Sequence, residues 1–479
     1  MRCPQFARAL ALVLFSLLVA PAAVQAEVRL HRLFSDHMVL QRGRPVRVFG
    51  WADPGEKITV KLGSVQGSGT AGKDGFFLVE LPPQKAGGPY ALVVQGKDSS
   101  VALRDVLVGE VWVCSGQSNM QWPVNRSANH EQVIATSRND KLRLFTVQRR
   151  PSDTPEQDVR GGPWQRCGPK TVPGFSAVAY HFGQTIQKKL GVPVGLISSN
   201  YGGTPAEAWT SRRALAAHPK LKYYLELPRN PRNKNRPYGL FNAMIHPLLK
   251  FPIRGAIWYQ GESNAGNFRR AEEYYTLFPV MIQDWRRHWG QGDFPFLFVQ
   301  LAPFRAKTTQ PSHVPWAVLR DAQLHTMKTV PNTAMAVIVD VGDERDIHPK
   351  QKGPVGHRLG LAALALAYGR DVVYSGPIYK CHTKKGDRIV VQFDFVGAGL
   401  VARGGPLTGF TICGPDRKFV NAQAKIEGNT VVVWSPEVKD PVAVRYGWAN
   451  YPLGNLWNFH GLPASPFRTD DFPVVPQKK

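Results

Sequence analysis

Segments typical of strands and of helices alternate from residue 109 to about residue 370. Short apolar runs predict buried strands at 111–114, 194–198, 256–259, 296–301 and 334–341. Helical spacing of apolar residues predicts helices at 177–190, 272–289, 317–328 and 355–368, with Gly191 and Gly290 as stop signals after the first two. This order predicts an α/β domain with a parallel sheet between two helical layers, which binds its ligand beyond the carboxyl ends of the strands.

The segments on either side of this domain lack the helical pattern. Between 27 and 108, Ile58, Val60 and Leu62 alternate with polar residues, and turn signals separate short strands. After 371, strands are expected at 389–395, 431–434 and 442–446. We therefore predict an N-terminal β-sandwich-like module at 27–108, a central domain at 109–370 and a C-terminal β-rich module at 371–479.

Residues 1–26 have the pattern of a cleavable signal peptide. Arg2 and Arg8 precede an uncharged apolar run at 9–19, and small residues stand at the −3 and −1 positions before a cut after Ala26. The run is shorter than the ~20 residues that a spanning helix needs, so we expect no stable membrane insertion. The mature protein is predicted to be secreted or periplasmic.

The mature chain is strongly basic. Without Arg2 and Arg8, Lys+Arg outnumber Asp+Glu by 58 to 35, a net charge of +23. Such a charge favours acidic partners, and export favours an acidic glycan over nucleic acid. The densest basic cluster, at 229–236, is interpreted as a solvated surface loop. Four cysteines remain after cleavage, and export permits a bridge between Cys381 and Cys413. No cysteine pair has the C-x-x-C spacing of a zinc site, and we expect no metal.

Ser118 follows the first strand of the central domain, in the segment Ser-Gly-Gln-Ser-Asn-Met at 115–120. A hydroxyl at the start of a helix lies near backbone N–H groups that favour developing negative charge. Alone, this serine could simply be a helix N-cap.

Three further segments follow later strands. Gly202 and Gly203 allow close backbone approach to a ligand, or form a tight turn. Gln260 and Asn264 carry amides that could point at a substrate carbonyl, or could cap a helix. Asp346 and His348 stand two residues apart, so an extended loop can present a base and its orienting carboxylate on one side, or the two residues form a metal half-site or a surface pair.

Four motifs in this order resemble the sialate O-acetylesterase family, a branch of the SGNH hydrolases. They are Ser-Gly-Gln-Ser-Asn-Met at 115–120, Gly-Gly-Thr-Pro-Ala-Glu-Ala-Trp at 202–209, Trp-Tyr-Gln-Gly-Glu-Ser-Asn at 258–264 and Asp-Ile-His-Pro at 346–349. The segments at 39–42 and 461–468 extend the resemblance to nearly the whole mature chain. The resemblance implies a flavodoxin-like, three-layer SGNH hydrolase domain flanked by two β-rich modules.

The resemblance also implies a serine esterase that removes O-acetyl groups from carbohydrates without a cofactor. Ser118 would be the nucleophile, His348 the general base and Asp346 its orienting carboxylate. The oxyanion hole would combine the Ser118 N–H, the Gly203 N–H (alternatively Gly202) and the Gln260 amide (alternatively Asn264). An acetylesterase for a plant or algal polysaccharide such as xylan, and a non-catalytic carbohydrate-binding protein, remain as alternatives.

Overall fold

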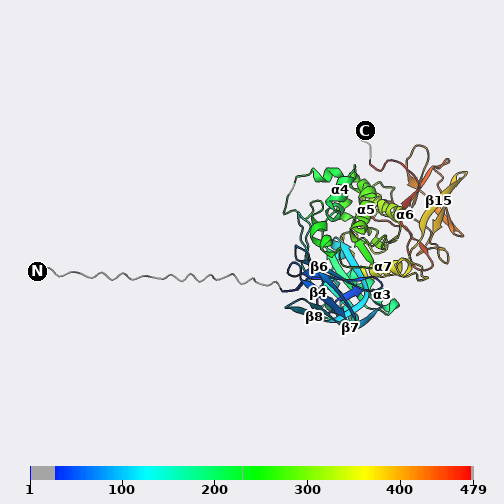
Figure 1. Cartoon of the computed structure of the whole chain (residues 1–479). Helices are drawn as coiled ribbons and strands as arrows, with labels where there is room; N and C mark the ends of the chain where they lie inside the picture. The colour runs from blue at the N-terminus through cyan, green and yellow to red at the C-terminus, as the bar shows by residue number, and fades with distance from the viewer. Residues whose placement is uncertain (2–26, 229, 476–479) are drawn as a thin grey trace.

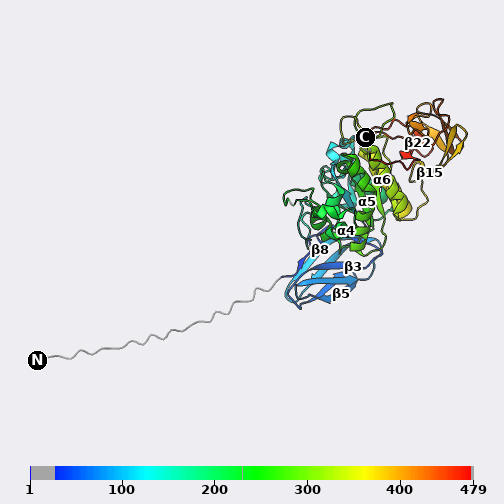
Figure 2. The same ribbon diagram turned by 90° about the horizontal axis from the view of Figure 1, so that it is seen from above.

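The computed structural model describes residues 1, 27–228 and 230–475. The apolar run and cleavage site of the predicted signal peptide lie outside the described residues, and so does Arg229. Seen from above, the N-terminal β module lies at one end of the molecule, the helical domain in the middle and the C-terminal β module at the other end (Figure 2). In the described residues, no helix has the length and apolar character to cross a bilayer.

A parallel sheet forms the centre of the molecule (Figure 1). Its strands lie in the order β9-β11-β8-β12-β13-β14, and neighbours in this run are parallel. Almost every residue of β11 to β14 is buried, because helices cover both faces of the sheet. The bounds are Asn139–Thr146 for β9, Val194–Asn200 for β11, Ser100–Gly116 for β8, Gly255–Tyr259 for β12, Phe296–Val299 for β13 and Thr333–Ala336 for β14.

Two pairs of helices flank this sheet. α3 (Ala177–Leu190) packs against α7 (Lys352–Leu366), and α5 (Phe268–Trp289) packs against α6 (Pro315–Thr329). In the sheet, β9 and β11 lie on one side of β8, and β12, β13 and β14 lie on its other side. Right-handed crossovers therefore place the two pairs on opposite faces. The carboxyl end of β8 lies where the strand order reverses, which is where open α/β sheets bind ligands.

β8 also belongs to the N-terminal module. Its first half alternates between exposed and half-buried residues and its second half is buried throughout. It pairs with β2 (Val39–Gln41) and β7 (Gly87–Gln95), and β7 continues to β4 (Lys57–Leu62) and β5 (Val65–Thr70). A second sheet of β1 (Arg29–Leu30), β3 (Val46–Trp51) and β6 (Phe76–Leu81) packs on this one. The predicted boundary at 108 therefore falls inside one strand.

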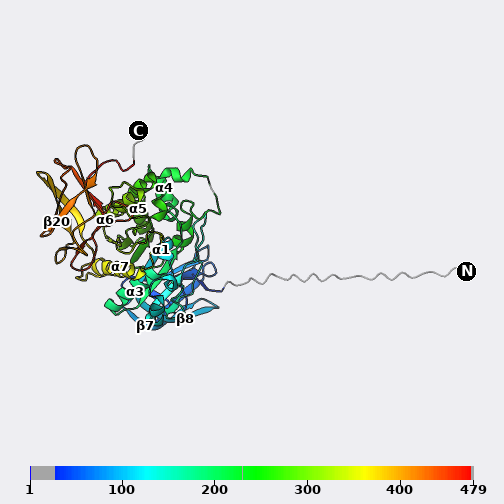
Figure 3. The ribbon, with the colours of Figure 1, turned by 180° about the vertical axis from the view of Figure 1, so that it is seen from behind.

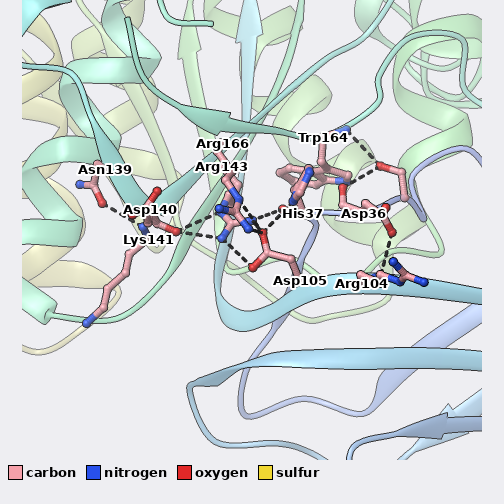
Figure 4. A network of polar contacts seen from close by, with 11 residues as sticks. Asp36, His37, Arg104, Asp105, Asn139, Asp140, Lys141, Arg143, Trp164 and Arg166 are labelled. Carbon is pink, nitrogen blue, oxygen red and sulfur yellow. Dashed lines mark hydrogen bonds and ion pairs between the residues drawn. The ribbon is translucent and has the colours of Figure 1, made fainter. Parts of the chain in front are cut away.

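A polar network fixes this module to the central domain (Figure 4). The Asp105 carboxylate on β8 accepts hydrogen bonds from Arg143 of β9 at 2.6 Å and from Arg166 of β10 (Gln165–Cys167) at 2.8 Å. His37 Nδ1 lies 2.7 Å from the same carboxylate. Burial alone would raise the pKa of Asp105, but the hydrogen bonds from Arg143 and His37 outweigh it and lower the pKa to about 2.

Up to residue 475, where the described part of the chain ends, the C-terminal module contains two four-stranded sheets and a two-stranded one. Cys381 is exposed and Cys413 is buried, and both are free thiols, so the bridge considered from the sequence does not form. The buried Arg320 of α6 donates to the carbonyls of Ala449 and Asn450, which joins this module to the central domain. The strands are β15 (Ile378–Lys385), β16 (Arg388–Asp394), β17 (Leu400–Ala402), β18 (Phe410–Cys413), β19 (Val420–Asn421), β20 (Gln423–Glu427), β21 (Thr430–Trp434), β22 (Ala443–Tyr446), β23 (Leu456–Asn458) and β24 (Phe467–Arg468).

Short helices lie in the connections of the central domain. Three of them are α-helical, namely α1 (Ser118–Gln121), α2 (His130–Ala135) and α4 (Arg212–Ala217). Seen from behind, α1 lies in the middle of the molecule (Figure 3). It follows β8 directly and begins with the predicted nucleophile.

Candidate active site

Ser118 stands at a sharp turn between β8 and α1, and its side chain is partly exposed. Gly116 makes this turn possible. Its φ is +136°, and a methyl group built on it would lie 2.2 Å from the Tyr259 carbonyl oxygen of β12. Only glycine fits there. The same carbonyl accepts a hydrogen bond from the Gln117 N–H at 3.0 Å, which fixes the residue before Ser118 to the neighbouring strand.

Asp346 and His348 lie on the loop between β14 and α7. The Asp346 carboxylate accepts a hydrogen bond from the His348 backbone N–H at 2.9 Å and lies 3.2 Å from His348 Nδ1. Asp343 shapes this loop, because its carboxylate accepts the N–H groups of Arg345 and Asp346 at 2.8 and 3.1 Å. These hydrogen bonds lower the pKa of Asp343. A proton on Nδ1, shared with Asp346, leaves Nε2 of His348 free to act as a base.

One cavity of about 330 Å³ contains all three predicted triad residues. Trp122 forms one wall, and its indole stacks on the His348 imidazole with 5.0 Å between ring centroids and 19° between planes. The indole N–H donates to the Arg126 carbonyl at 3.0 Å. Burial lowers the pKa of His348, and Asp346 opposes this shift. The lining residues are Ser118, Gln121, Trp122, Pro123, Arg126, Gly202, Asp346 and His348.

Sequence reasoning assigned no role to Gln121, Trp122 or Arg126. Gln121 ends α1, Trp122 follows it, and Arg126 ends the short helix Val124–Arg126. A helical projection from Ser118 could have suggested Gln121 and Trp122 but not Arg126. Arg126 is exposed, and its guanidinium lies 4.2 Å from the centroid of the Trp122 ring. It gives the cavity a positive rim.

The glycine of the second motif that lines the cavity is Gly202. A methyl group built on Gly202 would lie 3.3 Å from the Ser118 Cβ. Its N–H donates to Gln121 Oε1 at 2.8 Å. Gly203, preferred from the sequence, has a φ of +69° and serves the turn. The structure thus brings the alternative residue of the pair to the cavity.

Gln260 and Asn264 are fully buried and do not line the cavity. The Gln260 amide nitrogen donates to Asn264 Oδ1 at 2.7 Å and to the Thr204 carbonyl at 3.3 Å. The Asn264 amide nitrogen donates to Glu207 at 3.1 Å. Because these amide groups already have partners, they hold the Gly-Gly-Thr-Pro loop to β12. The oxyanion role expected for Gln260, with Asn264 as its alternative, does not fit this placement.

The basic cluster interpreted as a solvated loop reaches the site. Lys234 Nζ donates to the Gly202 carbonyl at 2.5 Å and lies 5.0 Å from the Tyr201 ring centroid. Arg236 is buried and pairs with Asp153 at 2.8 Å. The interpretation was wrong for these two residues, because a long cationic side chain with tertiary partners has the same sequence pattern as a solvated one. Lys234 adds a second positive charge near the cavity.

Among the described residues, no group of three or more His, Cys, Asp or Glu side chains is arranged to hold a metal ion. The chemistry that the cavity itself offers is a hydroxyl, an imidazole paired with a carboxylate, and nearby donors. That set fits acyl transfer.

Comparison with known proteins identifies the class of enzyme. The family "Carbohydrate esterase, sialic acid-specific acetylesterase" matches residues 108–365, a range that includes all three predicted triad residues. The sialate O-acetylesterase of Mus musculus is 33% identical over 90% of this chain and 92% of its own length. The human sialate O-acetylesterase is 33% identical over 77% of both chains. The crystal structure of a carbohydrate acetylesterase from Xanthomonas citri superposes with a TM-score of 0.87 at 42% identity, over 93% of this chain and all of that one.

These similarities define a carboxylic ester hydrolase. The chain belongs to the sialic acid-specific acetylesterase family of carbohydrate esterases.

Proposed function

We propose that this protein is a serine esterase that removes O-acetyl groups from carbohydrates through a Ser118-His348-Asp346 triad. The observation that carries the proposal is that the Asp346–His348 pair opens into the same cavity as Ser118. The sheet supports it. Without β9 and β10, which lie at one edge, its order in chain numbering is 2-1-3-4-5, the order of the flavodoxin-like sheet expected for SGNH hydrolases.

The mechanism follows the roles of the three side chains. His348 Nε2 takes the Ser118 proton as the hydroxyl oxygen attacks the acetyl carbonyl. Asp346 holds the Nδ1–H tautomer and stabilises the imidazolium. The sugar oxygen leaves with the proton from His348, and water then hydrolyses the acetyl-enzyme by the reverse proton transfers. No step requires a metal or an organic cofactor.

The oxyanion needs donors on the Ser118 side of the cavity. We assign this role to the Ser118 N–H and to the Gly202 N–H, which donates to Gln121 Oε1 at 2.8 Å and would exchange this partner for the oxyanion. The side-chain amide among the lining residues is that of Gln121, and it replaces Gln260 in our assignment. Loss of one such donor is expected to cost about 2.7–4 kcal/mol of transition-state stabilisation.

The substrate class is an acetylated glycan, as the printed names of the relatives suggest. Arg126 and Lys234 favour an acidic glycan, because both place positive charge near the cavity. Acetylated xylan remains the second candidate, because the 42%-identical relative from Xanthomonas citri is named for carbohydrate in general. The predicted signal peptide favours a reaction outside the cytoplasm. A mature N-terminus at Glu27 in the exported protein would confirm this location.

Acetate release tests the proposal. Wild type, Ser118→Ala and His348→Ala are assayed with p-nitrophenyl acetate, acetylated sialic acid and acetylated xylan. We expect turnover by wild type and none above background by either folded variant, and the relative rates identify the sugar. Full activity of Ser118→Ala, or an inert wild type that still binds glycan, would overturn the triad and favour the carbohydrate-binding alternative.

A further inference from the structure

Three polar side chains lie buried beside the nucleophile and outside the triad. They are Asn119 of α1, Glu262 at the start of the short helix Glu262–Asn264, and Lys352 at the start of α7. Their exposed fractions are 1%, 8% and 1%. Buried charges are rare unless they are paired, so this cluster requires an explanation.

Both polar atoms of the Asn119 side chain form hydrogen bonds. Its amide nitrogen donates to Glu262 Oε1 at 2.6 Å and to the Ile347 carbonyl at 3.0 Å. Its amide oxygen accepts from Lys352 Nζ at 2.5 Å. Asn119 follows Ser118 in the chain, and Ile347 lies between the acid and the base of the triad. One side chain therefore links the backbone of the nucleophile to the backbone of the Asp346–His348 loop.

The position of Lys352 is energetically unfavourable. Its ammonium is buried, which lowers the pKa of the side chain to about 7 although Glu262 and Asp346 oppose the shift. It is also the first residue of α7, where the helix dipole disfavours positive charge. A well-packed apolar side chain is commonly as stable as a buried ion pair or more so. Packing alone therefore does not explain a lysine here.

Lys352 and Glu262 do, however, fix the orientation of Asn119. The ammonium binds the amide oxygen, and the carboxylate binds the amide nitrogen, so the side chain cannot flip without losing both contacts. Lys352 also lies 5.8 Å from the centroid of the Trp122 ring, which stacks on His348. The cluster is thus linked to His348 indirectly from two sides, through the Ile347 backbone and through the Trp122 indole.

We propose that Asn119, Glu262 and Lys352 form a positioning cluster that sets the geometry between the nucleophile and the base, through the hydrogen bond from Asn119 to the Ile347 carbonyl. The inference rests on the proposed triad. None of the three touches the reacting atoms. They act through Ile347 and Trp122.

The test compares Asn119→Ala with Asn458→Ala. Asn458 is a matched control, because it is a fully buried asparagine of the C-terminal module whose amide donates to the carbonyls of Ser375 and Phe395. Each variant is measured for kcat and KM with p-nitrophenyl acetate, for the rate of serine labelling by a fluorophosphonate, and for its urea midpoint.

We expect the two variants to lose similar stability. Asn119→Ala should lose about 100-fold in kcat and in labelling rate with KM changed by less than about threefold, because a displacement of about 1 Å can cost that much. Asn458→Ala should keep both rates. Rates for folded Asn119→Ala within about threefold of the control would overturn the proposal.

Lys352→Met and Lys352→Arg keep the inference testable if Asn119→Ala does not fold. The charged groups that act on His348 are Asp346 of its own loop, Lys352 of α7 and Arg126 after α1. Removing the Lys352 ammonium should raise the pKa of His348 and move the acidic limb of kcat to higher pH, with kcat also reduced. Lys352→Arg keeps the positive charge and should restore the pH of the acidic limb. An unmoved limb and unchanged kcat in Lys352→Met would contradict the proposal.

Ser118→Ala, assayed in parallel, separates the two levels of the argument. If Ser118→Ala is inactive and Asn119→Ala is fully active, only the positioning cluster fails. If Ser118→Ala is active, the triad itself fails, and the cluster fails with it.

Discussion

Gly116→Ala is expected to damage both stability and catalysis. The φ of +136° is unfavourable for alanine and costs about 1–3 kcal/mol. The new methyl group would also lie 2.2 Å from the Tyr259 carbonyl oxygen, and relief of such overpacking costs about 1–3 kcal/mol more. The sum of roughly 2–6 kcal/mol is a large part of the 5–15 kcal/mol that stabilises a typical domain.

The overlap is with backbone, so a side-chain rotation cannot relieve it. The ends of β8 and β12 must separate, which breaks the hydrogen bond from Gln117 to Tyr259 and moves Ser118. We therefore expect a loss of activity beyond the loss of folded protein.

Gly191→Ala is the matched control. Its φ is +71°, and no atom lies within 4 Å of the added methyl group, so it carries the backbone penalty alone. Urea unfolding gives the stability of each variant, and kcat/KM per folded molecule gives the catalytic effect. Equal stability losses in the two variants, with full activity in Gly116→Ala, would refute this reasoning.

Four further predictions concern the base. Asp346→Asn should lower kcat by on the order of 10⁴-fold, because the amide cannot select the Nδ1–H tautomer; a loss below about tenfold would contradict this. The acidic limb of kcat/KM should lie below the ordinary histidine pKa of 6.5, because burial lowers the pKa of His348 and activity is lost as the imidazole protonates. Arg126 lowers the pKa of His348, so Arg126→Ala should move that limb to higher pH. Arg138 is exposed and does not line the cavity, so Arg138→Ala should leave the limb in place. Trp122 is buried and stacks on His348, so Trp122→Ala should lower the free energy of unfolding in urea by about 3–5 kcal/mol and reduce kcat. Trp122→Phe should recover most of the stability and most of kcat. Equal kcat values in Trp122→Ala and Trp122→Phe would contradict the role of the stack.

The central sheet and its helices could be predicted because their signals are local. The helix at 177–190 has the predicted bounds, with Ser176 accepting from the Ala179 N–H at its start and Gly191 in the left-handed conformation at its end. β8 was predicted only at 111–114. Its remaining length was missed because its burial pattern changes midway from alternating to continuous. No single period describes such a strand.

The residues of the proposed triad could be singled out from the sequence because residue type and order along the chain indicate their chemistry, and the structure brings all three to one cavity. The proposed oxyanion donors could not be singled out in this way, because they depend on which groups the fold brings to the cavity. Gln260 has an amide that could donate to an oxyanion, but in the structure this amide donates to Asn264 and Thr204. The burial of Lys352 could not be predicted either, because in sequence it is one of two lysines that follow Pro349 closely, and only the fold shows that it is buried.

The most direct test of the central claim is to trap the acyl-enzyme. Wild type is mixed with p-nitrophenyl acetate, quenched with acid within the first turnover, digested and analysed by peptide mass spectrometry. We predict one acetyl group on Ser118, and none on that residue in His348→Ala. Acetylation at another residue, or a full burst of nitrophenol in Ser118→Ala, would contradict the account.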